Sequence, residues 1–227
     1  MMNNQKLDEQ FEVLSNALRI FPERVMTLKY YVEEVNDPEE GISNIESAFR
    51  DVLNQFYGMV GVLKEEGIIS SLYVHESFNT LLCLRHALQH GSGKVKNMFR
   101  DVILNQQLFE IAEVKYSSSN SDIGRCPYLI SAEWLEHGVK ASNYANKWNG
   151  IDSYWCISEL KSEVEAKDKQ WSHVYLDGTI LVAQAMGELV KFYGNHITGT
   201  GFDSRTYLEH FNVMINIDSS DREIIFT

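Results

Sequence analysis

The sequence predicts a mainly α protein, and three observations support this fold class. Apolar residues recur at spacings of three and four through the first ninety residues, which is the period of a helix with one buried face. Prolines and glycines stand where these periodic runs stop. Hydrophobic residues make up 44% and charged residues 23% of the 227, values typical of folded globular chains and not of disordered or fibrous ones. We expect a single domain, because a chain of this length can bury one good core.

Residues 1–94 are expected to form the core, an up-and-down bundle of four helices. The first spans 7–21, where one apolar stripe is clear, and Pro22 is expected to end it and to open a second helix over 22–35. The third is expected to start at Pro38 and to close near residue 67.

The fourth helix carries the motif that matters most for function. Ser70 or Ser71 is a good N-cap for it, and Gly91 can take the left-handed conformation that terminates helices. We therefore place its last turn at residues 85–90.

Residues 95–227 are expected to pack on this bundle as a helical extension. The segments 95–104 and 108–117 fit either a short hairpin or a broken helix, and the polar stretch 117–127 reads as a loop. Helical patterns return at 131–148, 153–170 and 178–194, with four tryptophans that we assign to the core. The tail, 211–226, predicts two strands around an Asp-Ser-Ser-Asp turn, a small β-hairpin.

Charge and composition exclude several classes of protein. The net charge of −12 argues against a surface that grips nucleic acid all over, because phosphate binding rests on Lys and Arg. The N-terminus lacks the features of a secretion signal, and no apolar run is long enough to span a membrane. The three cysteines form no CxxC pair, which favours a reducing, cytoplasmic location over a disulfide framework.

Positive charge is concentrated around the end of the fourth helix. Residues 77–100 contain no acid and carry Arg85, Lys94, Lys96 and Arg100, whereas residues 1–66 hold thirteen acids against six bases. The three bases after Arg85 are candidate contacts for a phosphate-bearing substrate.

Arg85, His86 and His90 are the candidate chemical groups in this window. His86 and His90 share a helical face, and Arg85 lies about 140° from His90, which allows both to border one groove. The helix dipole favours a cation at His90, and Arg85 offers a planar charge for two phosphate oxygens. Together they suit attack of a ribose 2′-hydroxyl on the adjacent phosphate, with Arg85 stabilising charge and His90 moving a proton.

The string RHALQHG, residues 85–91, resembles the R-x4-6-H signature of the HEPN superfamily, in which a polar residue often follows the arginine. The resemblance implies a helical bundle, usually a homodimer, with the motif facing the partner copy. Many members are metal-independent endoribonucleases in toxin–antitoxin, phage-defence or RNA-processing systems, and others are inactive binding modules. Carried over by position, Arg85 and His90 would be the catalytic pair and His86 the auxiliary polar residue. RNA, a second copy of the chain and a cognate antitoxin or other protein are the implied partners.

Other readings of the same residues stay open. Arg85, His86 and His90 could simply form a solvated helix end. His86 and His90 could also be two ligands of a metal site, but the sequence has no further His or Cys cluster to supply the remaining ligands. We therefore expect no metal and no cofactor. Glu133 and His137 are expected to form a surface ion pair. The glycine-containing segment 194–202 is expected to be a helix cap and a loop, and not a phosphate-binding loop. Two function classes therefore remain: a ribonuclease, and a non-catalytic module that binds a protein or nucleotide.

Overall fold

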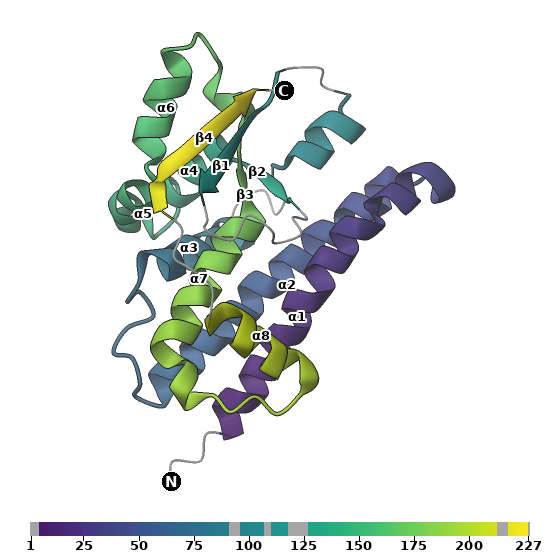
Figure 1. Cartoon of the computed structure of the whole chain (residues 1–227). Coiled ribbons are helices and arrows are strands. Elements are labelled where there is room, and N and C mark those ends of the chain that lie inside the picture. Colours follow the sequence, from purple (N-terminus) through teal and green to yellow (C-terminus); the bar gives the residue numbers. More distant parts are fainter. Residues whose placement is uncertain (1–4, 91–95, 107–109, 118–126, 213–217, 227) are drawn as a thin grey trace.

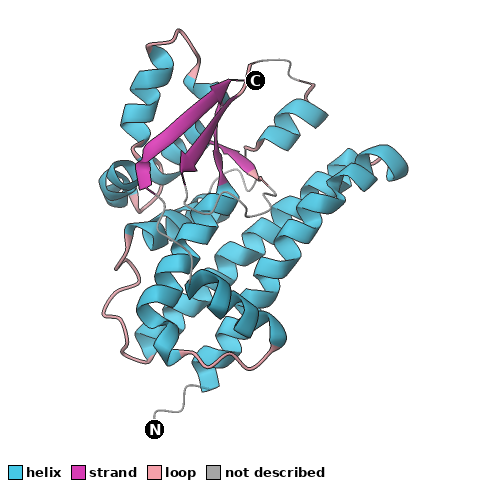
Figure 2. Cartoon of the chain, viewed as in Figure 1, coloured by secondary structure: helices cyan, strands magenta, loops and turns pink. Residues whose placement is uncertain are grey.

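Helices dominate the computed structural model, which describes residues 5–90, 96–106, 110–117, 127–212 and 218–226 (Figure 1, Figure 2). The α-helices are α1 (Gln5–Tyr30), α2 (Pro38–Glu65), α3 (Glu76–His90), α4 (Ala132–Lys140), α5 (Trp148–Trp155), α6 (Ile157–Glu165), α7 (Gly178–Tyr193) and α8 (Phe202–Asn212). Short π or 3-10 turns are η1 (Tyr31–Val35), η2 (Arg100–Leu104), η3 (Ala145–Lys147), η4 (Trp171–His173) and η5 (Gly194–His196). The strands are β1 (Ala112–Ser117), β2 (Leu129–Ser131), β3 (Val174–Asp177) and β4 (Asp218–Phe226). The predicted mainly α class is confirmed.

Helices α1 and α2 form a long antiparallel pair that runs obliquely across Figure 1. Helix α2 begins where the sequence predicts: Pro38 occupies its first turn, and the carboxylate of Asp37 accepts a hydrogen bond from the backbone N–H of Glu40 at 3.0 Å. This cap sets the point at which the chain turns back along α1.

The expected break at Pro22 is wrong, because α1 continues through it to Tyr30. Proline removes one backbone hydrogen bond and crowds the preceding turn. The apolar stripe nevertheless crosses this point, from Leu18 and Phe21 to Leu28, and all three side chains are buried. Packing on the rest of the core holds the helix together where the local sequence predicts an end.

Helix α3 starts at Glu76, later than expected. Ser71 caps a local turn instead of a helix: its hydroxyl accepts a hydrogen bond from the N–H of Tyr73 at 3.2 Å. The helix ends at His90, as predicted, and Gly91 lies outside the described residues.

The strands form one mixed sheet in the order β2-β3-β1-β4, gathered at one end of the molecule (Figure 2). β1 pairs in parallel with β3 and antiparallel with β4, and β2 pairs antiparallel with β3. This sheet replaces the expected C-terminal hairpin, since residues 218–221, the predicted turn, lie within strand β4. The stretch 95–117 likewise contains both the helical turn η2 and the strand β1.

The C-terminal half shares a hydrophobic core with the N-terminal helices. Helix α7 follows its prediction closely, whereas the predicted helices 131–148 and 153–170 are divided into α4, η3, α5 and α6. Cys156, with φ of 53°, separates α5 from α6. Helices α7 and α8 pack on α3 and α1, and one hydrophobic core includes residues from both halves. Three of the four tryptophans are buried in it, as expected, and Trp134 is partly buried.

The predicted loop 117–127 lies almost wholly outside the described residues. Within the described part of the chain, no helix has both the length and the apolar character needed to cross a bilayer.

Candidate functional site

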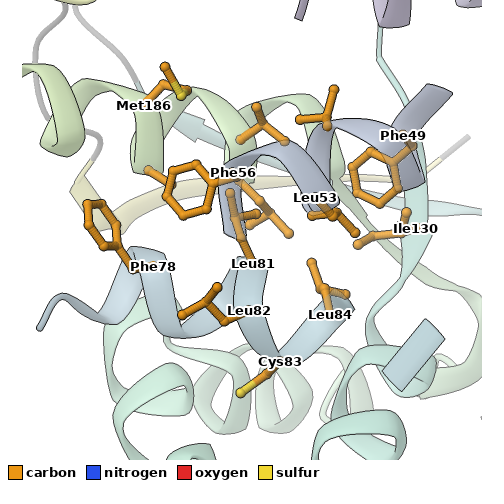
Figure 3. Close-up of a cluster of buried hydrophobic side chains, with 14 of the residues drawn as sticks. Phe49, Leu53, Phe56, Phe78, Leu81, Leu82, Cys83, Leu84, Ile130 and Met186 are labelled. Carbon is orange, nitrogen blue, oxygen red and sulfur yellow. The ribbon is translucent and has the colours of Figure 1, made fainter. Parts of the chain in front are cut away.

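Helix α3 is enclosed by other helices until its last turns. Residues 77–84 are all buried, and the helix contacts α2, α4, α5 and α7. Figure 3 shows Phe56 of α2 facing Leu81 of α3, with Cys83 pointing away from them. A helix whose residues are buried on all sides belongs to the core. Burial relaxes at Arg85, so the motif lies where α3 reaches the surface.

The Arg85 side chain is held by two residues of α2. Its Nε donates a hydrogen bond to Oδ1 of Asn54 at 2.9 Å, and its guanidinium carbon lies 4.1 Å from the ring centroid of Tyr57. Asn54 and Tyr57 are three residues apart and therefore share one helix face. Among the described residues, no carboxylate lies within ion-pair distance of Arg85. The guanidinium is oriented, and its charge is not neutralised there.

His86 lies beside Arg85 and is half-buried. Its ring stacks on Tyr144, with centroids 4.2 Å apart and planes at 25°, and meets Tyr57 edge to face at 6.4 Å. His90 is the last residue of α3, and its side chain lies outside the described part of the structure. The structure thus brings Arg85 and His86 into one neighbourhood and describes only the backbone of the third candidate.

The remaining predicted cations differ in their surroundings. Lys94 lies outside the described residues. The Nζ of Lys96 is 3.8 Å from a carboxylate oxygen of Glu133, and the two form an ion pair. Among the described residues, the expected ion pair between Glu133 and His137 is not formed. A half-exposed pair of this kind contributes little stability.

Arg100 is the anchor of a charged cluster in the structure. It donates from Nε and Nη2 to the two carboxylate oxygens of Glu46, at 2.9 and 3.1 Å, and from Nη1 to Glu39 at 3.0 Å. Asn97 donates to the same carboxylate of Glu46 at 2.8 Å. The hydrogen bonds to Glu46 raise the pKa of Arg100, so the guanidinium stays charged. Arg100, which the sequence assigns to substrate binding, ties η2 to α2 in the structure.

An aromatic row continues from Arg85 along the surface, and the sequence did not reveal it. We use "aromatic row" for the four half-buried rings of Tyr57, His86, Tyr144 and Tyr73, in that spatial order. Tyr144 and Tyr73 have centroids 5.5 Å apart, and the Nζ of Lys147 lies 4.7 Å from the Tyr73 ring centroid. Like Arg85, Lys147 has no ion pair with a described carboxylate. The row therefore has a cation at each end.

Serine-capped turns place two of these rings. Tyr73 follows the turn held by Ser71, and Tyr144 follows a turn in which Ser142 accepts its backbone N–H at 3.1 Å. Burial, then the hydrogen bond with Tyr144, raise the pKa of the Tyr73 phenol. The Tyr73 phenol can thus serve as a neutral hydrogen-bonding group. No motif spacing could have identified these residues, because they come from segments far apart in the chain.

The close approach of α4 to α3 brings the Tyr144 turn into position. A Cβ atom at Gly138 would lie 2.9 Å from the Cβ of Ala87, closer than such atoms normally approach. Glycine therefore allows α4 to pack directly on the last turns of α3. The turn after α4 then passes beside His86.

A second polar cluster lies between α3, α5 and α7 and is mostly buried. The carboxylate of Glu188 accepts hydrogen bonds from the Ser77 hydroxyl and, at 2.7 Å, from the Tyr154 hydroxyl. Gln184 donates to the same Tyr154 hydroxyl at 2.7 Å. Ser77 has no exposed surface, so it cannot meet a substrate. The cluster satisfies buried polar groups between helices.

The glycine-rich stretch 194–202 is a cap and loop, as predicted. Its backbone N–H groups at Thr198 and Gly201 donate to carboxylates of Asp8, at 2.7 Å, and Glu12, at 2.9 Å. Carboxylates of α1 thus occupy donors that a phosphate would need. Elsewhere in the described chain, no three His, Cys, Asp or Glu side chains gather closely enough to hold a metal ion.

The chain was compared with family models, curated proteins and solved structures, and none of the three comparisons found a match.

Proposed function

We propose that this protein is a metal-independent endoribonuclease that binds RNA where α3 reaches the surface. The observation that carries the proposal is the state of Arg85: Asn54 and Tyr57 orient its guanidinium, and no described carboxylate neutralises it. A planar, oriented and uncompensated guanidinium suits two oxygens of a phosphodiester. The resemblance of residues 85–91 to the HEPN signature supplies the reaction class.

In the proposed reaction, the ribose 2′-hydroxyl attacks the adjacent phosphorus and displaces the 5′-oxygen of the next nucleotide. Arg85 stabilises the negative charge that develops on the phosphate, and His90 moves a proton. The products are a 2′,3′-cyclic phosphate and a free 5′-hydroxyl. His86, stacked on Tyr144, takes the role of a neighbouring positioning residue.

The resemblance also implies a homodimer, and we propose that two copies meet near the end of α3. The burial of residues 77–84 restricts such a contact to the last turns of this helix. Two copies would offer two histidines, one to accept the proton of the 2′-hydroxyl and one to protonate the leaving oxygen.

A non-catalytic module that binds a protein or a nucleotide is the second candidate, and the pairing of Arg100 and Lys96 with carboxylates favours it. A nuclease that relied on the whole basic window would have these charges available, whereas here they are largely neutralised. In that case the Arg85 surface binds a protein or nucleotide partner and cuts no RNA.

Cleavage assays with single-residue variants test the proposal. Purified protein is incubated with mixed RNAs in EDTA, beside Arg85→Ala, His90→Ala and the control Arg24→Ala, which removes an exposed arginine of α1. We expect the two site variants to lose about 10²- to 10³-fold in rate, and the control to keep its rate. The products should carry 2′,3′-cyclic phosphate ends. Absence of cleavage in the wild-type protein, or equal cleavage by all four proteins, would rule out the enzyme.

A further inference from the structure

We propose that the substrate is single-stranded RNA, whose unpaired bases stack on the aromatic row while its phosphates contact Arg85 and Lys147. This inference deepens the proposed function and rests on it for the location of the site. It adds Lys147, Tyr144 and Tyr73 to the residues that bind the substrate.

Two cations at the ends of the row supply the first argument. In a chain with 32 acids and 20 bases, many cations are taken up by carboxylates, as Arg100, Arg222 and Lys140 illustrate. Arg85 and Lys147 pack against tyrosine rings instead and form no ion pair with a described carboxylate. An uncompensated cation beside a ring is the combination that binds a phosphate next to a stacked base.

The rings supply the second argument. All four residues of the aromatic row are half-buried, so packing holds each ring while part of the residue stays accessible. Fixed rings lose little conformational entropy when a base stacks on them. Stacking is tolerant of base identity, because every base has a π-face.

The same geometry selects unpaired nucleotides. In a duplex, neighbouring bases cover both faces of each base, and sequence-tolerant recognition uses the phosphates and the shape of the grooves. A row of rings can reach only bases that are out of the stack. We therefore expect loops, ends and single strands to bind, and continuous duplexes to bind weakly.

Fluorescence anisotropy tests this substrate class separately from cleavage. Full-length His90→Ala protein, used to prevent cutting, is titrated in EDTA with labelled single-stranded oligoribonucleotides and with the matched duplex. Tyr144→Ala and Lys147→Ala are introduced in this background. The matched control is Lys167→Ala, because Lys167 also lies over a ring, that of Phe226 at 5.2 Å, but belongs to the turn after α6 and not to the aromatic row.

We expect Tyr144→Ala to weaken single-strand binding about 5- to 150-fold, the effect of losing one stacked base. Lys147→Ala should weaken binding and lower the slope of log affinity against log salt by about 1. Lys167→Ala should leave both unchanged. If Tyr144→Ala fails to fold, Tyr144→Leu keeps the bulk of the side chain but removes the π-face, and it should show the same loss.

The outcomes separate this inference from the proposed nuclease. Single-strand binding that depends on Tyr144, in a protein that does not cut RNA, would support the inference and remove the enzyme. If cleavage depends on Arg85 while folded Tyr144 and Lys147 variants bind RNA with unchanged affinity, the proposed nuclease is supported and the inference is ruled out. Equal affinity for the duplex would overturn the inference outright.

Discussion

Arg85 and Arg100 carry the same guanidinium in opposite electrostatic surroundings. Arg85 packs on Tyr57 with one neutral hydrogen-bond partner, whereas Arg100 binds both oxygens of Glu46. The side chains of Arg100 and Glu46 are only 15% and 10% exposed. A pair this buried is costly to break, because the remaining charge loses both water and its partner.

Arg100→Ala should therefore destabilise the protein by about 3 kcal/mol, because it leaves the Glu46 carboxylate nearly buried and without its bidentate partner. Urea denaturation followed by circular dichroism measures the change. Lys96→Ala is the matched control, since its pair with Glu133 is half-exposed, and its effect should stay below about 1 kcal/mol. RNA affinity of the folded Arg100→Ala protein should equal that of the wild type. A loss of affinity without a loss of stability would return Arg100 to the binding site.

At the scale of elements, local signals located some ends of helices and misplaced others. Asp37 and Pro38 predicted the start of α2 correctly, because cap and first-turn preferences act within a few residues. The predictions from Pro22 and Ser71 were wrong: α1 continues past Pro22 because its apolar face stays packed on the core, and Ser71 caps a turn that precedes α3. The contacts that override these local signals come from residues elsewhere in the chain, so the local sequence pattern could not predict them.

Pro22→Ala should stabilise the protein, because alanine restores the hydrogen bond to the preceding turn of α1 and removes the clash of the proline ring. We expect a gain of about 1 to 3 kcal/mol, reduced by the greater freedom of the unfolded chain. Thermal unfolding and urea titration measure it. Arg24→Ala, at an exposed position two residues further along α1, controls for changes that act only on the helix surface. An unchanged or lower stability in Pro22→Ala would mean that α1 depends on the shape that proline imposes there.

At the scale of the whole molecule, charge along the sequence differs from charge in space. The window 77–100 has no acid, yet Glu39, Glu46 and Glu133 reach it from other segments. Conversely, Lys147 lies at the other end of the aromatic row from Arg85 and comes from a distant turn. The sheet is built from strands that are distant in sequence. The sequence predicted the helical class and the end of α3 correctly, and the role of Arg85 stays a prediction. The sheet, the ion pairs around Arg100 and the position of Lys147 depend on contacts between segments that are distant in the sequence.

His75 makes the stability of the whole fold sensitive to acid. It lies between α3 and α7, with its ring stacked on Phe192 at 4.7 Å and its Nε2 2.9 Å from the hydroxyl of Tyr193. Burial lowers the pKa of His75 below its usual 6.5, and Glu188, 3.9 Å from Nδ1, only partly opposes this. Between the lowered value and 6.5, the unfolded chain binds more protons than the folded one, so unfolding becomes easier as pH falls.

We expect the free energy of unfolding to decrease as pH falls through about 6.5 and to stop responding to His75 below its lowered folded pKa. His75→Asn removes this proton-binding group, so its stability relative to the wild type should rise over the same interval. His210→Asn, which replaces an exposed histidine of α8, should leave the His75 contribution in place. Urea denaturation at a series of pH values on either side of 6.5 measures all three proteins. A wild-type curve parallel to that of His75→Asn would show that the attraction of Glu188 balances the cost of burial. A wild type that gained stability relative to His75→Asn as pH fell would show that the attraction outweighs this cost, so that protonated His75 holds α3 and α7 together.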